Sequence, residues 1–180
     1  AASYPQVFAR AYRGRRAEGF DYLEAEVAGR APSFGYSVLA QILATTKHKV
    51  VVTTNYDNLV VDALSIYTTA TALVGGRESL AGFIRHRPAH PEVVKVHQDW
   101  FHASQHATEA TGVLPTEFAH ALKELFEEHI PVVIGYGGND GGLMGVLNDA
   151  NLGLQQGIYW CYVKGGPRPR QEILDVVERH

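Results

Sequence analysis

The fold of this chain is limited above all by three valine-rich runs that end abruptly in small or polar residues. The runs cover residues 49–54, 92–96 and 131–135. Short β-branched runs bounded by turn residues are typical of buried strands in a parallel sheet. In open α/β sheets a ligand binds beyond the carboxyl ends of the strands. The residues that follow the three runs are therefore expected to converge on one site.

Helical patterns alternate with these runs along the chain. Further strands are expected at 70–74 and 157–163, and residues 99–112 have the polar composition of a loop. Helices are expected at 4–12, 20–28, 78–85 and 116–127, and from about residues 33, 57, 140 and 168. Ser33 and Thr116 are expected to cap two of them. This alternation predicts a single α/β domain over 1–180, a three-layer Rossmann-like fold with a mainly parallel sheet.

The composition is that of an ordinary globular protein, with 180 residues, 46% apolar residues and a net charge of −3. A chain of this charge carries no electrostatic footprint for nucleic acid. Its one basic cluster is expected to be a solvated helix face and comprises Arg10, Arg13, Arg15 and Arg16. No apolar run is long enough for a bilayer, and the first residues lack a signal-peptide pattern. A cytoplasmic protein without a membrane partner is expected.

The chain has one cysteine, Cys161, inside the apolar run 158–163. Its setting predicts a buried thiol, which is compatible with a reducing compartment. A single cysteine excludes an internal disulfide and a four-cysteine zinc site.

Polar residues follow the first run directly, as Thr53-Thr54-Asn55-Tyr56-Asp57. Asn55 offers a donor and an acceptor, and Asp57 offers a charged acceptor. Ribose hydroxyls and a carboxamide need such partners. The alternative is a structural one, in which Asp57 caps the next helix and Asn55 is a turn residue.

His97 closes the second run, and an imidazole at a strand end can act as a general base near neutral pH. The alternative is a histidine whose ring is bonded to a backbone carbonyl. A metal site formed by His97, His102 and His106 has weak support, because these residues have no cysteine and no second ligand cluster beside them.

The third run leads into Gly135-Tyr136-Gly137-Gly138-Asn139-Asp140. Small residues there let the backbone approach a phosphate or a sugar. The spacing matches neither the dinucleotide fingerprint nor a P-loop. The alternative is a tight turn with Asp140 as a helix cap.

Taken in order, the three motifs resemble the sirtuin-like family, and most closely its bacterial NADase branch. Thr-Thr-Asn-Tyr-Asp is similar to the family's catalytic Asn motif, and Val-Val-Lys-Val-His is similar to its Lys-x-His motif. Ile-Gly-Tyr-Gly-Gly-Asn-Asp resembles its Gly-Tyr-Ser-x-x-Asp loop. The resemblance runs from about residue 33 to residue 176.

The resemblance implies an NAD glycohydrolase that cleaves the nicotinamide–ribose bond of its substrate NAD. It implies that Asn55 holds the ribose and the attacking water, that Asp57 bonds the nicotinamide amide, and that His97 is the general base. It assigns further NAD contacts to the neighbouring motif residues Thr54, Gly135, Tyr136, Gly137, Asn139 and Asp140. The branch also implies a role in bacterial defence, a sensor or effector domain as partner, and a homo-oligomer.

The chain departs from the family pattern in several ways. The family's first strand and its Gly-Ala-Gly-x-Ser loop are not found, so the sequence is expected to be a fragment of a longer protein. Gln98 stands where the family usually has Gly, and Gly137 stands where Ser is common. The paired Cys-x-x-Cys zinc module is absent, so no zinc is expected. These departures leave open a second function, that of an NAD- or nucleotide-binding or assembly module with weak turnover.

Overall fold

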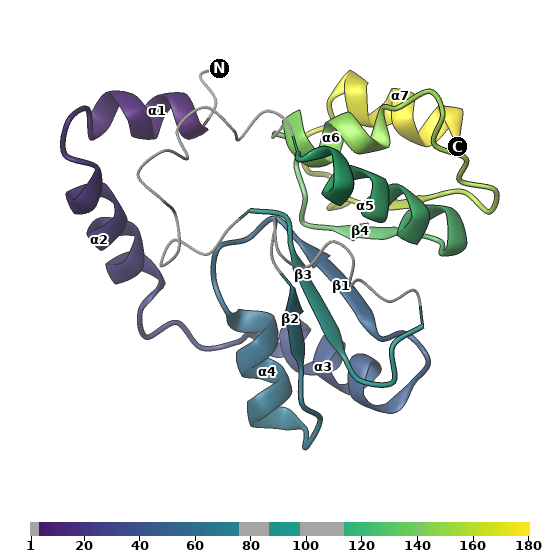
Figure 1. Cartoon of the computed structure of the whole chain (residues 1–180), viewed down its shortest axis with the longest axis horizontal. Helices are drawn as coiled ribbons and strands as arrows, with labels where there is room; N and C mark the ends of the chain where they lie inside the picture. The colour runs from purple at the N-terminus through teal and green to yellow at the C-terminus, as the bar shows by residue number, and fades with distance from the viewer. Residues whose placement is uncertain (1–3, 76–86, 98–113, 140) are drawn as a thin grey trace. The chain divides into compact units, whose positions relative to one another are not determined.

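A computed structural model of the chain describes residues 4–75, 87–97, 114–139 and 141–180. The chain divides into two compact units, residues 1–109 and 110–180. The first unit (Figure 1) contains α1 (Tyr4–Ala11), α2 (Arg16–Val27), α3 (Phe34–Thr45), β1 (Val50–Thr53), α4 (Leu59–Tyr67), β2 (Leu73–Gly75) and β3 (Glu92–Lys95). The second contains α5 (Thr116–Glu128), β4 (Val132–Ile134), α6 (Gly141–Leu147), β5 (Tyr159–Cys161) and α7 (Gln171–Arg179).

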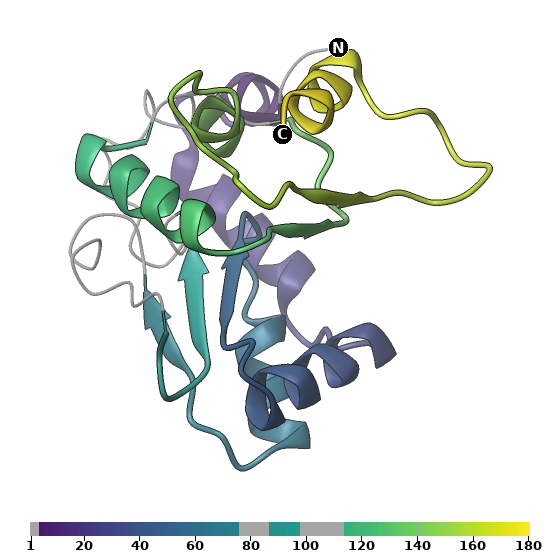
Figure 2. The same cartoon turned by 90° about the vertical axis from the view of Figure 1, so that its right-hand side faces the viewer.

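The first unit is built on a three-stranded parallel sheet with the order β1-β3-β2. Val93 of β3 lies opposite Val51 of β1 on one side and Val74 of β2 on the other. The three strands run in the same direction, as Figure 2 shows. All four residues of the central strand β3 are buried, as expected for a valine-rich strand with a neighbour on each side.

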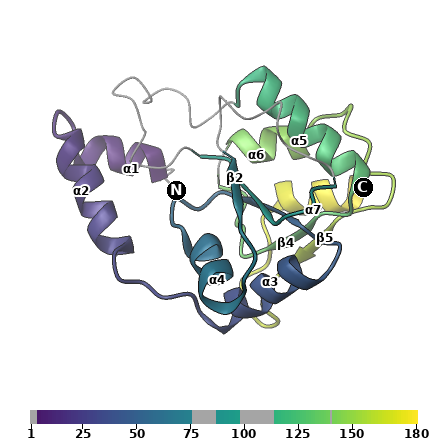
Figure 3. The same cartoon turned by 60° about the horizontal axis from the view of Figure 1, so that its bottom comes forward.

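Helices α3 and α4 pack side by side in the first unit (Figure 3). Their buried residues recur at helical spacing, which gives each helix one apolar face. These faces form one core with Val93 of β3, and its buried members are Ala40, Leu43, Val60, Ala63, Leu64 and Val93. Burying a side chain of the Val or Leu type contributes about 1.5–3 kcal/mol to folding. This core fixes the sheet and hence the ends of β1 and β3.

The described part of the second unit has a parallel pair of strands, β4 and β5, and three helices. Its largest fully buried side chains come from the helices: Phe118, Leu122, Met144, Leu147 and Val176. Helix α5 alone buries five apolar residues. The helices therefore carry most of the buried apolar surface of this unit.

The two strands of the second unit are more exposed than the sequence predicts. Val132 and Ile134 of β4 are 59% and 75% exposed, and Tyr159 of β5 is 63% exposed. The register pairs Val132 with Tyr159 and Ile134 with Cys161, so these four side chains share one face of the strand pair. The prediction of a buried thiol at Cys161 is wrong, because this residue lies on that exposed face.

The alternation of strands and helices is confirmed, and every described strand pair is parallel. The strands that the structure describes form two small sheets, one within each unit. Two capping predictions are wrong in detail. Ser33 occupies the N-cap position of α3 without a side-chain cap bond, and Thr116 is the first helical residue of α5 after the N-cap Pro115. The predicted helix 78–85 and the predicted polar loop 99–112 lie outside the described residues.

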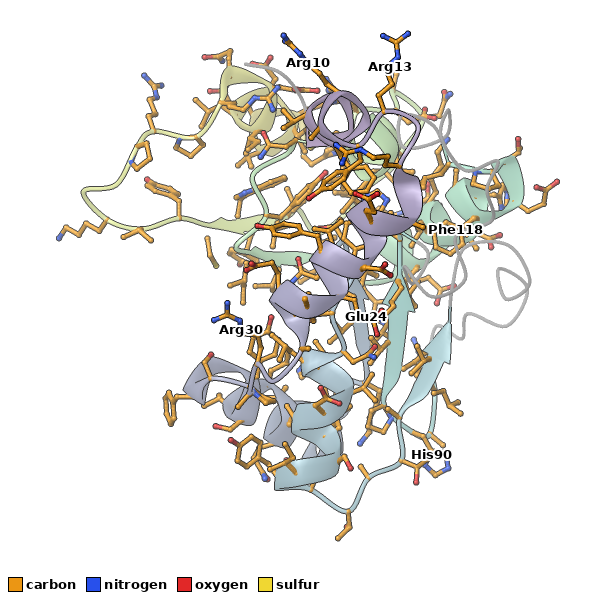
Figure 4. All side chains as sticks on the ribbon, turned by 90° about the vertical axis from the view of Figure 1, so that its left-hand side faces the viewer. Arg10, Arg13, Glu24, Arg30, His90 and Phe118 are labelled. Atoms are coloured by element: carbon orange, nitrogen blue, oxygen red, sulfur yellow. The ribbon has the colours of Figure 1, made fainter. Side chains whose placement is uncertain are left out.

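The basic cluster at the start of the chain is solvent-exposed where the structure describes its side chains. Arg10 and Arg13 are exposed and extend away from the ribbon in Figure 4. Arg15 pairs with Glu18 at 3.1 Å, and both side chains are exposed. Solvent exposure is confirmed for these three arginines, but Arg13 and Arg15 lie between α1 and α2 and not on a helix face. None of the described helices is long and apolar enough to cross a bilayer.

Candidate active site

The polar residues predicted after the first two valine-rich runs lie at neighbouring strand ends. β1 and β3 are adjacent and parallel, and Thr53 lies opposite Lys95 at the last position of each strand. Asn55 and Asp57 follow β1, and His97 follows β3. The sheet therefore brings the two segments to one edge, as predicted.

Two local hydrogen bonds shape the turn after β1. The backbone N–H of Asn55 donates to Thr53 Oγ1 at 3.0 Å, and the backbone N–H of Leu59 donates to Asp57 Oδ1 at 3.1 Å. The second bond secures the start of α4, so the structural alternative for Asp57 is realised by one of its oxygens. Asn55 is exposed, while Thr54 and Asp57 are half-buried.

His97 is nearly buried, with 8% of its surface exposed. Its ring stacks with the ring of Tyr56, with 5.5 Å between the centroids and 26° between the planes. This contact joins the end of β3 to the turn after β1. Gln98, which follows it, lies outside the described residues.

The turn has a further neighbour that sequence reasoning missed, Tyr36 of α3. Its side chain is half-buried and packs against the core of the first unit, and its hydroxyl shares a hydrogen bond with the Asn55 side chain. Burial raises the pKa of Tyr36 above its ordinary value; the Asp57 charge raises it further, and the bond with Asn55 opposes both. A tyrosine in a helical pattern is usually a packing residue, so nothing in the sequence marks Tyr36 as a neighbour of the Asn55 turn.

Lys95, within the predicted Lys-x-His motif, was also given no role by sequence reasoning. Its side chain is 2% exposed. Its Nζ donates to Asn58 Oδ1 at 2.6 Å and to the backbone oxygen of Tyr56 at 3.3 Å. Buried lysines are rare unless their ammonium group is bonded.

The glycine-rich loop of the second unit follows β4. Gly135 and Gly138 have φ values of +70° and +65°, in the left-handed region that favours glycine. A Cβ at Gly138 would also lie 3.1 Å from Ile173 Cγ1 and 3.3 Å from Met144 Sδ. Both glycines therefore meet a conformational requirement, as the tight-turn alternative predicts, and Gly138 also meets a packing requirement.

Two side chains from later elements hold this loop. Arg170 Nη1 donates to the backbone oxygen of Gly138 at 2.9 Å and to Asn139 Oδ1 at 3.0 Å. Trp160 Nε1 donates to the backbone oxygen of Tyr136 at 3.2 Å, and the two rings stack with centroids 5.7 Å apart. The loop is thus fixed by β5 and by the residue that precedes α7.

The predicted site residues fall into two groups. Asn55, Asp57 and His97 belong to the first unit, and the glycine-rich loop belongs to the second. Convergence of the two groups stays a prediction. Asp140, His102 and His106 lie outside the described residues. Among the residues that the structure describes, no group of three or more His, Cys, Asp or Glu side chains could hold a metal ion.

The first group has the chemistry that a ribose and a primary amide require. An exposed carboxamide donates and accepts, a half-buried carboxylate accepts, and an imidazole can take a proton. These residues therefore offer hydrogen-bond partners for a ligand that carries hydroxyl and amide groups.

Comparison with known proteins agrees with this fold and this order of motifs. A family model described as SIR2-like domain matches residues 49–175, which include both strand-end segments and the glycine-rich loop. A search of the curated proteins finds no match. Because the family match covers most of the sequence, the chain belongs to the SIR2-like domain family.

Proposed function

We propose that this domain hydrolyses NAD at the bond between nicotinamide and ribose. Its membership of the SIR2-like family connects it with NAD. The observation that carries the finer proposal is the contact between the two strand ends, where Tyr56, next to Asn55, stacks on His97. A polar carboxamide and a candidate base lie at one edge of the sheet.

The reaction requires two contributions from these residues, stabilisation of a cation and acceptance of a proton. When the C1′–N bond breaks, its electron pair leaves with nicotinamide and a ribosyl cation of oxocarbenium character remains. Oriented dipoles stabilise such a cation, and the carboxamide of Asn55 can supply one. Water then adds to C1′ and loses a proton, and His97 is the base proposed to accept it. The products are nicotinamide, ADP-ribose and one proton.

The Asp57 carboxylate is proposed to accept a hydrogen bond from the nicotinamide amide. The glycine-rich loop, with Gly135, Tyr136, Gly137 and Asn139, is proposed to contact the adenosine part, together with Asp140. Exposed backbone at Gly135 supports this role, since nothing lies within 4 Å of the place of a Cβ there, whereas the Asn139 side chain lies beside Gly137.

In the cell we propose a role in bacterial defence, in which loss of NAD is the effector response. A fused or separate sensor domain and a homo-oligomer are proposed as partners. These proposals rest on the resemblance of the three motifs to the bacterial NADase branch.

A binding or assembly module with weak turnover is the second candidate. Two contacts favour it. One Asp57 oxygen secures helix α4, and Asn139 Oδ1 accepts a bond from Arg170. Polar atoms committed to the fold have less capacity for a ligand.

Nicotinamide release from NAD by the full-length protein distinguishes the two candidates. We expect the wild-type protein to release nicotinamide and Asn55→Ala and His97→Ala to lose about 10²–10⁴ in rate. His90→Ala, at a second histidine of the same unit that is exposed and labelled in Figure 4, is the matched control and should keep full activity. Normal turnover by a folded His97→Ala variant would show that His97 is not the base.

A further inference from the structure

Lys95 places a buried ammonium group at the junction of β3 and the turn after β1. It is the last residue of β3, and its side chain is 2% exposed. Its Nζ reaches across to Asn58 Oδ1 at 2.6 Å and to the backbone oxygen of Tyr56 at 3.3 Å. An ammonium group loses its hydration on burial, so such bonds are needed to keep it there.

The Asn58 side chain makes this bond instead of capping helix α4. It occupies the N-cap position of α4, where an asparagine side chain normally accepts a bond from the first turn of the helix. Here it makes no cap bond, and its oxygen accepts from Lys95 instead. The start of α4 is secured by Asp57 Oδ1, which accepts from the N–H of Leu59.

Tyr56 strengthens the same connection. Its backbone oxygen accepts from Lys95, and its ring stacks on the ring of His97. The turn that carries Asn55 and Asp57 is therefore fixed to the end of β3 by the Asn58 side chain, the Tyr56 backbone and the Tyr56 ring.

We propose that Lys95 is a positioning residue that sets the distance between the Asn55 turn and His97 through its bonds to Asn58 and Tyr56. This inference rests on the proposed NAD hydrolysis, since it concerns the geometry of that site. A small displacement of reacting groups lowers the rate of the chemical step more than it lowers binding.

Asn58 offers the sharper test, because its side chain is exposed and its replacement leaves the buried core intact. In nicotinamide-release assays of the full-length protein, Asn58→Ala should lower kcat about 10-fold, as for loss of a bond to a charged group. KM should stay unchanged, while Tm should fall slightly because the buried ammonium group loses one bonding partner. Asn58→Asp keeps the acceptor oxygen and should keep kcat.

Lys95→Met removes the donor from the same pair. The double variant Lys95→Met/Asn58→Ala should have the same kcat as Lys95→Met alone, because both substitutions remove the same bond between Lys95 and Asn58. Additive losses, an unchanged kcat in Asn58→Ala, or an equal loss in Asn58→Asp would each overturn the inference.

Hydrogen exchange tests the positioning role of Lys95 without relying on the proposed NAD hydrolysis. The N–H groups of Asn55 and Leu59 are bonded within the turn. Asn58→Ala should speed their exchange about 10-fold, and Asn58→Asp should not. If the wild-type protein releases no nicotinamide, the proposed function fails, and exchange alone decides on Lys95. Unchanged exchange in Asn58→Ala would overturn the inference in either case.

Discussion

Strands β3 and β4 have similar valine-rich sequences and very different surroundings. β3 lies between two parallel neighbours, and Val94 at its centre is fully buried. β4 has one described neighbour, and Val132 is 59% exposed. A β-branched run therefore predicts a strand, whereas burial depends on the layers and neighbours around it.

The polar segments after these strands differ in the same way. The turn after β1 is fixed by residues of the neighbouring strand, Lys95 and the adjacent His97. The loop after β4 is fixed from outside its own strand pair by Arg170, and from β5 by Trp160. One segment is positioned by the sheet, and the other depends on a long side chain that precedes a helix.

The largest effect should come from truncating the buried valine. Val94→Ala should lower the free energy of unfolding by about 2–3 kcal/mol, since it removes two methyl groups from the core and leaves a cavity. Val132→Ala makes the same change on the exposed face of β4 and should stay within about 0.5 kcal/mol. Urea denaturation followed by circular dichroism measures both. Equal losses would remove the contrast between the strands.

The two left-handed glycines of the loop after β4 should differ in their tolerance of alanine. Gly138→Ala should cost about 2 kcal/mol, because backbone strain adds to the close approach of Ile173 and Met144. At Gly135 a Cβ meets nothing within 4 Å, so only backbone strain of about 1 kcal/mol is expected. Thermal unfolding of both variants checks the order, and a less stable Gly135→Ala would reverse it.

Tyr36→Phe tests the contact between α3 and the Asn55 turn. The loss of one hydroxyl bond should cost about 1 kcal/mol, while Tyr67→Phe, at an exposed tyrosine, serves as the control. Burial and the Asp57 charge raise the pKa of Tyr36, so the folded state is destabilised when this hydroxyl ionises: its stability is fully present below pH about 10 and falls as pH rises through the folded-state pKa. The pKa of Tyr22 is raised as well, so ultraviolet titration should show one fewer late-ionising tyrosine in Tyr36→Phe than in the wild-type protein.

The smallest effect is expected on the surface of the second unit. The bond from Lys123 lowers the pKa of Asp149 below its ordinary value, and bonds from Asn151 act in the same direction. The stability from this carboxylate is therefore present above pH about 4 and lost as pH falls through the lowered pKa. Asp149→Asn should unfold slightly earlier than wild type at pH 7 and equally at pH 2. If Asp149→Asn still unfolded earlier than wild type at pH 2, the difference in stability would not come from the charge of the Asp149 carboxylate.

Much of the fold could be predicted because local pattern and local structure agree. Valine-rich runs formed β1, β3 and β4, and amphipathic spacing formed α5 over almost the predicted range. The exposure of Cys161 could not be predicted, because an apolar strand sequence does not report how many layers cover it. The division into two sheets depends on strand pairing, which is a non-local property.

The candidate site was predicted at the strand ends, where a parallel sheet collects polar residues. Tyr36 and Lys95 were not assigned, for different reasons. Tyr36 comes from a helix earlier in the chain, and only tertiary packing brings it to Asn55. Lys95 has a residue type that is usually exposed, so its burial is visible only in three dimensions.

The central place of β3 has a consequence for how the first unit is synthesised and folds. β3 pairs residue 92 with residue 50 of β1 and with residue 73 of β2, so it is the last of the three described strands of its sheet to leave the ribosome. Until it arrives, β1 and β2 lack their shared partner and expose unpaired backbone edges. Long-range parallel pairing of this kind slows folding and prolongs exposure to aggregation. The nascent chain is therefore most vulnerable while residues 50–91 are synthesised and β3 is still missing.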